Sequence, residues 1–384
     1  MLIPEDNDCR HGLWNTVEID LAALRGNYRL IQKKVGPRVR IMAVVKADAY
    51  GHGLIRSAKA LAEAGVRCFG VAEAGEGLLL RQAGLRGEII VLLGVTPESY
   101  NDVIRSRLQP VVFDMASLAG LSAAAVAQND KIGIHLKVDV GMGRLGIMPA
   151  EVDAFAEALP RMAGLYLSGI MSHFPLADDP DPHRNQEQLA IFTAVLERFG
   201  AAAAPAKIRH IANSAALLHD IDTHFDMVRP GITLYGCYPG SPEADQALPG
   251  LRPVLSFKTR VLQIKAVPAD YGLSYGHTFV TARPSRLAVL PVGYHNGYLR
   301  KLSNRAAVLI KGRRAPVRGR VCMNACVVDV TDLPTVRPGD EAVLLGRQGG
   351  AEITADEVAG WLETISYEVL CLFGNRNRRI YVDT

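Results

Sequence analysis

Apolar residues between about residues 40 and 232 form short continuous runs that alternate with longer stretches of helical periodicity. Continuous apolar runs are typical of parallel strands buried on both faces, and their alternation with helices predicts βαβ units. The predicted strands are Ile41–Val45, Cys68–Val71, Ile89–Leu93, Gln109–Phe113, Ile134–Val138, Leu167–Met171, Ile208–Ile211 and Asp226–Val228. The predicted helices between them include Leu54–Ala64, Glu73–Ala83, Met115–Gln128 and Gln186–Phe199. Eight such strands favour a closed (β/α)8 barrel over an open parallel sheet.

The pattern changes after Gly250, where short β-type segments are separated by Pro and Gly turns. The segments are Val254–Val267, Arg286–Val292, Ala306–Ile310, Ala315–Val330 and Glu341–Leu345. One helix is predicted here, over Thr354–Leu362, with Thr354 and Glu357 placed as a capping box. We therefore expect a barrel domain over residues 1–250 and a mainly β domain over residues 251–384, with packing of about the first 18 residues on the β domain as an alternative.

Composition excludes several classes of protein. The 43 basic and 39 acidic residues leave a net charge of +4, which is small for a nucleic-acid binder. No apolar run approaches the roughly 20 residues that cross a bilayer, and the acidic start has no signal-peptide core, so a cytoplasmic location is expected. The six cysteines do not form a disulfide scaffold. Cys322 and Cys326 have no second pair at zinc-site spacing, so no metal site is expected.

A lysine stands at the end of the first predicted barrel strand, in the segment Val44–Gly53. Residues at the carboxyl ends of barrel strands face the active site. Partial desolvation there favours the neutral amine of Lys46 and makes it a competent Schiff-base nucleophile. The alternative is a lysine that ends the strand in solvent.

Other polar residues follow later strands. Lys137 and Arg144 lie in the Gly-rich segment after the fifth strand, which could instead be a salt-bridged surface loop. His173 ends the sixth strand, and His210, Asn213 and Ser214 stand at the end of the seventh and the start of a helix. Arg229, Gly231 and Ile232 follow the eighth strand, and barrels commonly bind phosphate at the loops after strands seven and eight.

The segment Val44–Gly53 closely resembles the pyridoxal-phosphate attachment motif of alanine racemases, and the resemblance continues along nearly the whole chain. It implies a pyridoxal 5'-phosphate enzyme that interconverts L- and D-alanine, supplies D-alanine for peptidoglycan and works as a homodimer with shared active sites. The cofactor-binding residues that it implies are Lys46, Tyr50, Arg144, His173, Asn213, Ser214, Arg229, Gly231, Ile232 and Tyr367.

Individual roles follow from the same resemblance. Lys46 would carry the cofactor, and Tyr50 would contact its phosphate. His210 would hold Arg229, which would face the pyridine nitrogen. A guanidinium has no proton acceptor, so that nitrogen should stay unprotonated, which weakens the ring as an electron sink. Lys137 would be carbamylated, so that an anion pairs with Arg144.

Racemisation needs proton transfer on both faces of the substrate Cα. Lys46 would serve one face, and Tyr275, supplied by the partner subunit, the other. A tyrosine has a reference pKa of about 10, so this role requires a nearby cation such as Arg144. The alternative is a buried structural tyrosine. Tyr294 would line the entrance, and the amide of Met323 would bind the substrate carboxylate.

The chain departs from the family pattern at three places. Asn324 stands where the family commonly has aspartate, and His295 and Asn296 replace Ala and Asp in a Gly-Tyr-Ala-Asp-Gly motif. Residues 374–379 also differ. Serine-accepting relatives resemble the chain at Asn324, so a serine or serine/alanine racemase is an alternative.

Two further alternatives are a barrel-type pyridoxal decarboxylase of basic amino acids and a single-barrel protein of pyridoxal homeostasis. Decarboxylases of that type place a carboxylate at the ring nitrogen and a cysteine opposite the lysine, so Arg229 and Tyr275 argue against the first. The second lacks a domain corresponding to the residues after Gly250.

Overall fold

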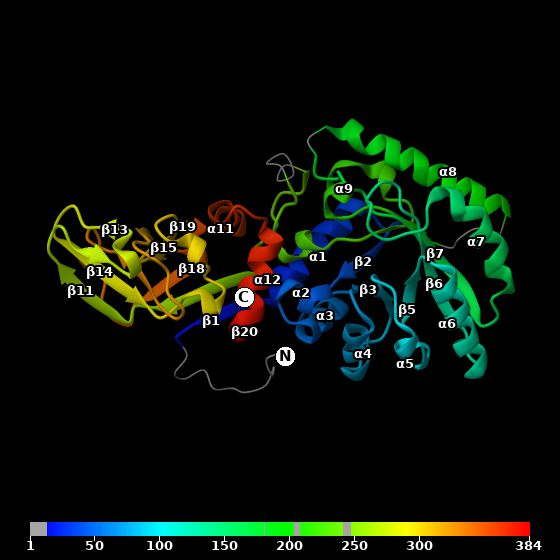
Figure 1. Ribbon diagram of the computed structural model, residues 1–384, viewed down its shortest axis with the longest axis horizontal. Coiled ribbons are helices and arrows are strands. Elements are labelled where there is room, and N and C mark those ends of the chain that lie inside the picture. Colours follow the sequence, from blue (N-terminus) through cyan, green and yellow to red (C-terminus); the bar gives the residue numbers. More distant parts are fainter. Residues whose placement is uncertain (1–13, 180, 203–207, 241–246) are drawn as a thin grey trace. The chain divides into compact units, whose positions relative to one another are not determined.

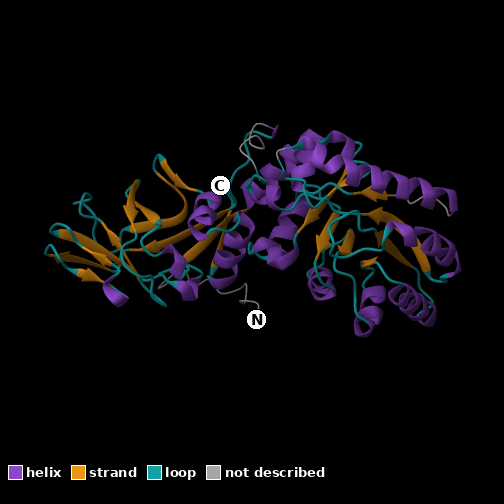
Figure 2. Cartoon of the chain, turned by 45° about the horizontal axis from the view of Figure 1, so that its top comes forward, coloured by secondary structure: helices purple, strands orange, loops and turns teal. Residues whose placement is uncertain are grey.

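The computed structural model describes residues 14–179, 181–202, 208–240 and 247–384. Two compact units are present (Figures 1 and 2). The barrel unit contains Leu24–Ala49 and Leu54–Arg252, and the β unit contains the described residues up to Ala23, Tyr50–Gly53 and Pro253–Thr384. In the described part of the chain, no helix has the length and apolar character to cross a membrane.

The barrel unit is built around eight parallel strands, with helices on their outer side (Figure 1). The strands are β2 (Arg40–Val44), β3 (Cys68–Val71), β4 (Glu88–Val91), β5 (Gln109–Val112), β6 (Ile132–Lys137), β7 (Leu165–Met171), β8 (Ile208–His210) and β9 (Met227–Val228). The helices are α1 (Leu21–Val35), α3 (Leu54–Glu63), α4 (Ala74–Gln82), α5 (Tyr100–Arg105), α6 (Met115–Ala127), α7 (Val152–Ala158), α8 (Gln186–Ala202) and α9 (Ser214–His219), and the short segment α2 (Lys46–Tyr50) is a left-handed turn after β2. Each of the eight predicted strands is present, with ends that differ by at most two residues.

The sheet is ordered β8-β7-β6-β5-β4-β3-β2-β9 and is nearly closed. Single backbone hydrogen bonds join its two ends, because Asp226 N donates to Arg209 O at 3.1 Å and Arg229 N donates to Ala212 O at 3.0 Å. The Arg209 Nε atom also lies 2.7 Å from Asp226 Oδ2. The predicted eight-stranded barrel is confirmed.

Apolar side chains from nearly every strand fill the barrel interior. The cluster contains Met42, Cys68, Ile90, Val111, Met171, Ile208 and Met227, with Leu92 and Phe113 packed against it. Because the core is solid, ligands can reach only its ends, and the carboxyl end is where the predicted site residues follow the strands.

The β unit is mainly antiparallel, and its strands are drawn in orange in Figure 2. One sheet has the order β16-β15-β18-β10-β1-β20 with β19 on β18, a second has the order β11-β14-β17, and β12 pairs with β13. The strands are β1 (Thr16–Asp20), β10 (Leu255–Arg260), β11 (Gln263–Val267), β12 (Gly272–Leu273), β13 (Phe279–Val280), β14 (Ser285–Leu290), β15 (Ala307–Ile310), β16 (Arg313–Pro316), β17 (Cys326–Asp329), β18 (Glu341–Gln348), β19 (Ala351–Ile353) and β20 (Arg379–Val382). The predicted mainly β second domain is confirmed. Residues 16–20 belong to its sheet, whereas residues 1–13 lie outside the described residues.

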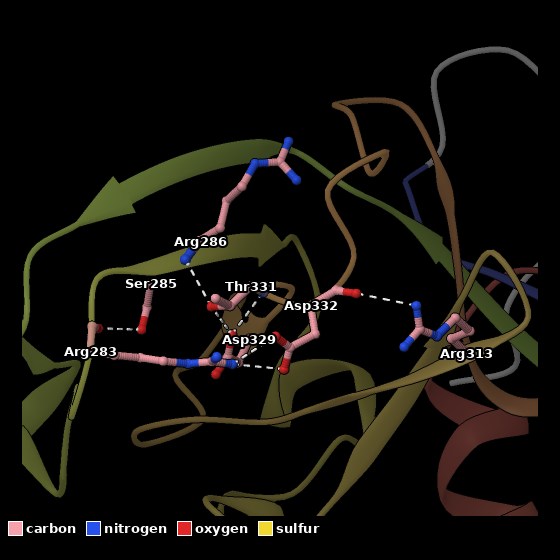
Figure 3. A network of polar contacts seen from close by, with 7 residues as sticks. All are labelled: Arg283, Ser285, Arg286, Arg313, Asp329, Thr331 and Asp332. Atoms are coloured by element: carbon pink, nitrogen blue, oxygen red, sulfur yellow. Dashed lines mark hydrogen bonds and ion pairs between the residues drawn. The ribbon is translucent and has the colours of Figure 1, made fainter.

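A polar network ties β14 to the turn after β17 (Figure 3). Arg283 Nη2 bonds both carboxylate oxygens of Asp332 at 2.8 and 2.7 Å. Arg286 N donates to Thr331 Oγ1 at 2.9 Å, and Arg313 Nη1 donates to the backbone oxygen of Asp332 at 3.2 Å. The network thus stabilises one end of the smaller sheet through polar contacts and not through burial of apolar side chains.

One predicted feature of the β unit is correct and one is wrong. Helix α11 (Ala355–Leu362) is capped by Thr354, whose Oγ1 accepts a hydrogen bond from Glu357 N at 3.1 Å, whereas the Glu357 carboxylate binds Arg314, so only the N-cap half of the predicted capping box is formed. The prediction of a single helix was wrong, since α12 (Ser366–Arg376) follows it. Gly374 weakens the helical propensity of this segment. Tertiary packing stabilises the helix instead, with the rings of Phe373 and Phe257 4.9 Å apart.

Candidate active site at the carboxyl ends of the barrel strands

Lys46 begins an unusual turn directly after β2. Ala47, Asp48 and Ala49 all have φ of 54°, which is the left-handed helical region. For residues other than glycine this conformation costs roughly 1–2 kcal/mol each, so surrounding contacts must stabilise it.

Two carboxylates stabilise the left-handed turn. Asp48 Oδ1 accepts a hydrogen bond from Leu54 N at 2.7 Å. Glu76 accepts from Asp48 N at 3.2 Å and from Ala72 N at 2.8 Å. The half-buried Lys46 is therefore carried by a turn whose backbone is held from two sides. The sequence prediction did not include Asp48 or Glu76. An aspartate within a loop of small residues often accepts backbone hydrogen bonds, and this pattern could have identified Asp48.

Lys137 ends β6 and is only 6% exposed. Burial, together with the positive charges of Arg144 and Arg229, lowers the pKa of its amine to about 8. A buried lysine with a depressed pKa is inconsistent with a salt-bridged surface loop. Arg144 itself is exposed to solvent within this chain.

The loop between Lys137 and Arg144 is organised by Asp139. Its Oδ1 accepts hydrogen bonds from the amides of Gly141, Met142 and Gly143 at 2.8, 2.7 and 3.2 Å, and Oδ2 accepts from Arg144 N at 3.1 Å. These bonds keep the pKa of Asp139 below its usual value, although burial acts in the opposite direction. The sequence prediction missed Asp139, yet an aspartate before a Gly-rich turn is a recognisable sign of this arrangement.

Arg229, which follows β9, is buried among acceptors. Its Nη2 donates to Ser172 O at 2.8 Å, to Ile211 O at 2.9 Å and to His173 Nδ1 at 3.1 Å, and Nη1 lies 3.3 Å from His210 Nδ1. Burial lowers its pKa to about 9, so the guanidinium is still protonated at pH 7. Within the described residues its Nε makes no hydrogen bond, so the Nε–H is available to a ligand.

The neighbouring histidines are neutral acceptors. Burial and the charge of Arg229 hold the pKa of His173 far below its usual value. Burial and the contact with His135 do the same for His210, with a further contribution from Arg229. A neutral imidazole can accept from the guanidinium, so these side chains stabilise Arg229 without competing for its charge.

The segments after β8 and β9 meet at Ser214. Its Oγ accepts a hydrogen bond from Gly231 N at 2.9 Å. Asn213 caps helix α9, because its Oδ1 accepts from the amides of Ala215 and Ala216, each at 3.0 Å. Ile232 is fully buried. The predicted phosphate-binding residues Ser214 and Gly231 are thus adjacent in the barrel unit.

The other two predicted phosphate ligands meet in the β unit. The rings of Tyr50 and Tyr367 lie 6.1 Å apart, and burial raises the pKa of Tyr50. Tyr50 is held close to α12 by Gly51 and Gly374, whose backbones touch. A Cβ on Gly374 would lie 2.0 Å from Gly51 O, and Gly51 has φ of +84°.

Tyr275, Tyr294 and Met323 lie on neighbouring loops of the β unit. Tyr294 N donates to Cys322 O at 3.1 Å and His295 N to Met323 O at 3.0 Å. Ser274 Oγ donates to Arg320 O at 2.6 Å, which ties the loop of Tyr275 to the same segment. Tyr275 is 70% exposed, so it is not a buried structural tyrosine.

The two units together define a class of protein: a (β/α)8 barrel with a lysine at a strand end, joined to a mainly β unit. Family models described as alanine racemase, N-terminal domain, and alanine racemase, C-terminal domain, match residues 19–239 and 254–381. The chain belongs to the alanine racemase family.

Similar proteins cover almost the whole chain. The alanine racemase of Syntrophobacter fumaroxidans is 45% identical over 94% of this chain and 96% of that protein. The alanine racemase of Halothermothrix orenii is 43% identical over 95% of this chain and 96% of that protein.

Solved structures agree with these matches. The alanine racemase from the D-cycloserine producing Streptomyces lavendulae is 38% identical, with a TM-score of 0.91 and coverage of 98% of both chains. The alanine racemase from Bartonella henselae with covalently bound pyridoxal phosphate is 31% identical, with a TM-score of 0.86 and coverage of 97% of this chain and 100% of that chain.

We predict that Gly374→Ala lowers the midpoint of urea unfolding, because the added methyl group would force α12 away from the backbone of Gly51. Overpacking of this kind costs typically 1–3 kcal/mol. Gly360→Ala in α11 is the matched control, since a Cβ there meets nothing within 4 Å. The control should be as stable as the parent or more stable. Equal stability of Gly374→Ala and the parent would contradict the proposed contact.

Proposed function

We propose that the protein is a cytoplasmic, pyridoxal-phosphate-dependent racemase that interconverts L- and D-alanine and supplies D-alanine for peptidoglycan. The observation that carries this proposal is the buried, protonated Arg229 with an unused Nε, located in the same barrel unit as the strand-end residue Lys46. We also propose that residues 1–250 form the cofactor-binding domain and that residues 251–384 form the domain that supplies the second acid/base residue.

The donors of the barrel unit fit the cofactor. Lys46 offers a primary amine for covalent attachment. Ser214 Oγ accepts a hydrogen bond from the amide of Gly231 at 2.9 Å, and the hydroxyl can donate its own proton to an anion at the position where barrels commonly bind phosphate. Thr233 Oγ1, whose backbone amide lies 3.5 Å from Ser214 Oγ, is buried without a hydrogen-bond partner in the described part of the chain. In the proposed site, Tyr50 and Tyr367 contact the phosphate, Asn213 and Ile232 line it, and His173 packs near the ring.

Arg229 sets the electronic character of the reaction. When bound, pyridoxal phosphate withdraws electrons from the substrate Cα and so acidifies its proton. Arg229 can only donate hydrogen bonds, so a pyridine nitrogen that faces it keeps its lone pair and gains no proton. Electron withdrawal is thereby moderated, which favours return of the proton to Cα over side reactions. His210 holds Arg229 in place.

Two acid/base residues act on opposite faces of Cα. Lys46 moves a proton on one face, and Tyr275 of the partner subunit moves a proton on the other. The exposure of Tyr275 within a single chain supports a role in a shared site of a homodimer. Arg144 stabilises the phenolate and the substrate carboxylate, the Met323 amide binds that carboxylate, and Tyr294 lines the entrance.

The competing cofactor functions agree less well with the site. A decarboxylase of basic amino acids would need a carboxylate at the ring nitrogen, whereas the residue that we propose for that place is Arg229, which lies among carbonyl oxygens and neutral histidines. A single-barrel protein of pyridoxal homeostasis leaves the sheets after Pro253 without a role.

The central experiment combines absorption spectra with racemase assays. We expect a visible-edge absorption band that borohydride abolishes, and conversion of both alanine enantiomers. Lys46→Ala should lose the band and nearly all activity. Tyr275→Phe should keep the band but lose about 10²–10⁴-fold in rate, since one acid/base group is removed.

Exchange of the alanine α-proton in D2O separates the two faces. Tyr275→Phe should retain exchange for one enantiomer only, whereas Tyr271→Phe, which changes an exposed tyrosine outside the predicted set, should behave as the parent. Wild-type rates in Tyr275→Phe would exclude the two-base mechanism.

We propose that Lys137 is carbamylated and pairs with Arg144. Its neutral amine adds CO2 and releases one proton, so the pKa of about 8 predicts that the carbamate fraction rises between pH 7 and 9 at constant dissolved CO2. A carbamate resonance from ¹³CO2 should be present in the parent and in Lys131→Arg, which changes an exposed lysine, and absent in Lys137→Arg. A resonance that survives in Lys137→Arg would assign the modification elsewhere.

Asn324 favours serine as a second substrate, because its amide can donate a hydrogen bond to a side-chain hydroxyl. It is exposed on the turn that carries Met323. Asn324→Asp should lower the ratio of kcat/KM for serine to that for alanine by roughly 2–10-fold, the value of one hydrogen bond. Asn129→Asp, at an exposed position after α6, should leave the ratio unchanged. An unchanged ratio in Asn324→Asp would remove this residue as the determinant.

A further inference from the structure

A line of hydrogen-bonded polar side chains runs from Arg229 into the barrel interior. His210 Nε2 lies 3.0 Å from His135 Nδ1, and His135 Nε2 lies 2.9 Å from Gln109 Oε1. With the contact of 3.3 Å between Arg229 Nη1 and His210 Nδ1, four side chains form one continuous chain. His135 and Gln109, from β6 and β5, do not belong to the predicted site.

Only one set of histidine tautomers satisfies every hydrogen bond in this chain. The Arg229 guanidinium can only donate, so His210 Nδ1 must accept and the proton of His210 must be on Nε2. That proton is donated to His135 Nδ1, so His135 carries its own proton on Nε2 and donates it to Gln109 Oε1. Burial lowers the pKa of His135 to about 3, which agrees with a neutral ring.

A glycine on the intervening strand makes the contact between the histidines possible. His135 and His210 belong to β6 and β8, which are separated by β7. Gly169 of β7 is paired with His135, and a Cβ on it would lie 2.6 Å from His135 Nδ1. The imidazole therefore occupies space that any other residue would close, and the two rings meet edge to face at 5.0 Å.

We propose that His135 and Gln109 are positioning residues that orient Arg229 through the tautomer of His210. The inference rests on the proposed function, in which Arg229 faces the cofactor ring. The amide oxygen of Gln109 can only accept, so it stabilises the same tautomer of His135, and through it of His210, that Arg229 requires at the other end of the chain. His210 Nδ1 then always presents a lone pair to Arg229. This lone pair holds Arg229 Nη1 on the side of His210, so that Arg229 Nε faces the proposed ligand.

Neutron diffraction of the perdeuterated protein, purified with its cofactor, tests the proton arrangement directly. We expect deuterium on Nε2 and none on Nδ1 in both His135 and His210. Deuterium on Nδ1 of either ring would overturn the proposal. This result does not depend on activity, so an absence of racemisation would refute the proposed function while leaving the polar chain to be judged separately.

Gln109→Glu tests the functional consequence, because a carboxylate next to His135 favours a doubly protonated ring. Both His135 nitrogens would then donate, His210 would have to accept at Nε2, and its proton would face Arg229. We expect kcat to fall between about 10-fold and 100-fold with KM changed less than about threefold, as for a misplaced cofactor contact. The absorption band of the bound cofactor should also shift.

Matched variants separate positioning from folding. Gln32→Glu makes the same chemical change at an exposed position in α1 and should keep the kcat and the spectrum of the parent. Gln109→Met removes the acceptor without adding charge and should shift the band less than Gln109→Glu does. Unchanged kcat and spectrum in folded Gln109→Glu would overturn the proposal. If Gln109→Glu does not fold, an unchanged spectrum in Gln109→Met would overturn it.

Discussion

The burial of one guanidinium governs the architecture of the candidate site. A buried charge is costly unless polar partners replace its hydration, so Arg229 must collect acceptors from several directions. It collects backbone oxygens from Ser172 and Ile211 and imidazole nitrogens from His173 and His210. These residues follow β7 and β8, so the arginine brings together the strand ends on both sides of the barrel closure. A slip of either strand by one residue would leave the charge without its partners.

Carboxylates that accept backbone amides build the remaining loops of the barrel unit. Asp139 accepts hydrogen bonds from the four successive amides of residues 141–144, and Asp48 and Glu76 hold the left-handed turn after Lys46. Each contact fixes the conformation of a loop that is anchored on the rigid barrel. Side chains in the proposed chemistry therefore stand on backbone whose conformation was set before any ligand arrives.

The β unit contributes residues of a different kind. Tyr275, Tyr294 and Met323 are exposed within a single chain, although the backbone that carries them is closely hydrogen-bonded. Asn296 and Asn377 add to this order, since Asn377 Nδ2 donates to Asn296 O at 2.8 Å and Asn296 Nδ2 donates to Asn377 Oδ1 at 3.1 Å. Two separate departures from the family pattern are thus in contact and form one local arrangement. Exposed side chains on ordered loops suit a surface completed by a second protein subunit.

The sequence by itself determined the eight barrel strands, the mainly β second unit and the residues at the strand ends, because these follow from local periodicity and from motifs a few residues long. Only the tertiary structure revealed α12, since its helical state depends on packing of Phe373 and Gly374 against residues far away in the chain. The roles of Gln109, His135 and Gly169 were also decided only in three dimensions. Each is an unremarkable strand residue in the sequence, and their relation arises because parallel strands in register place side chains of β5, β6 and β8 within hydrogen-bond distance.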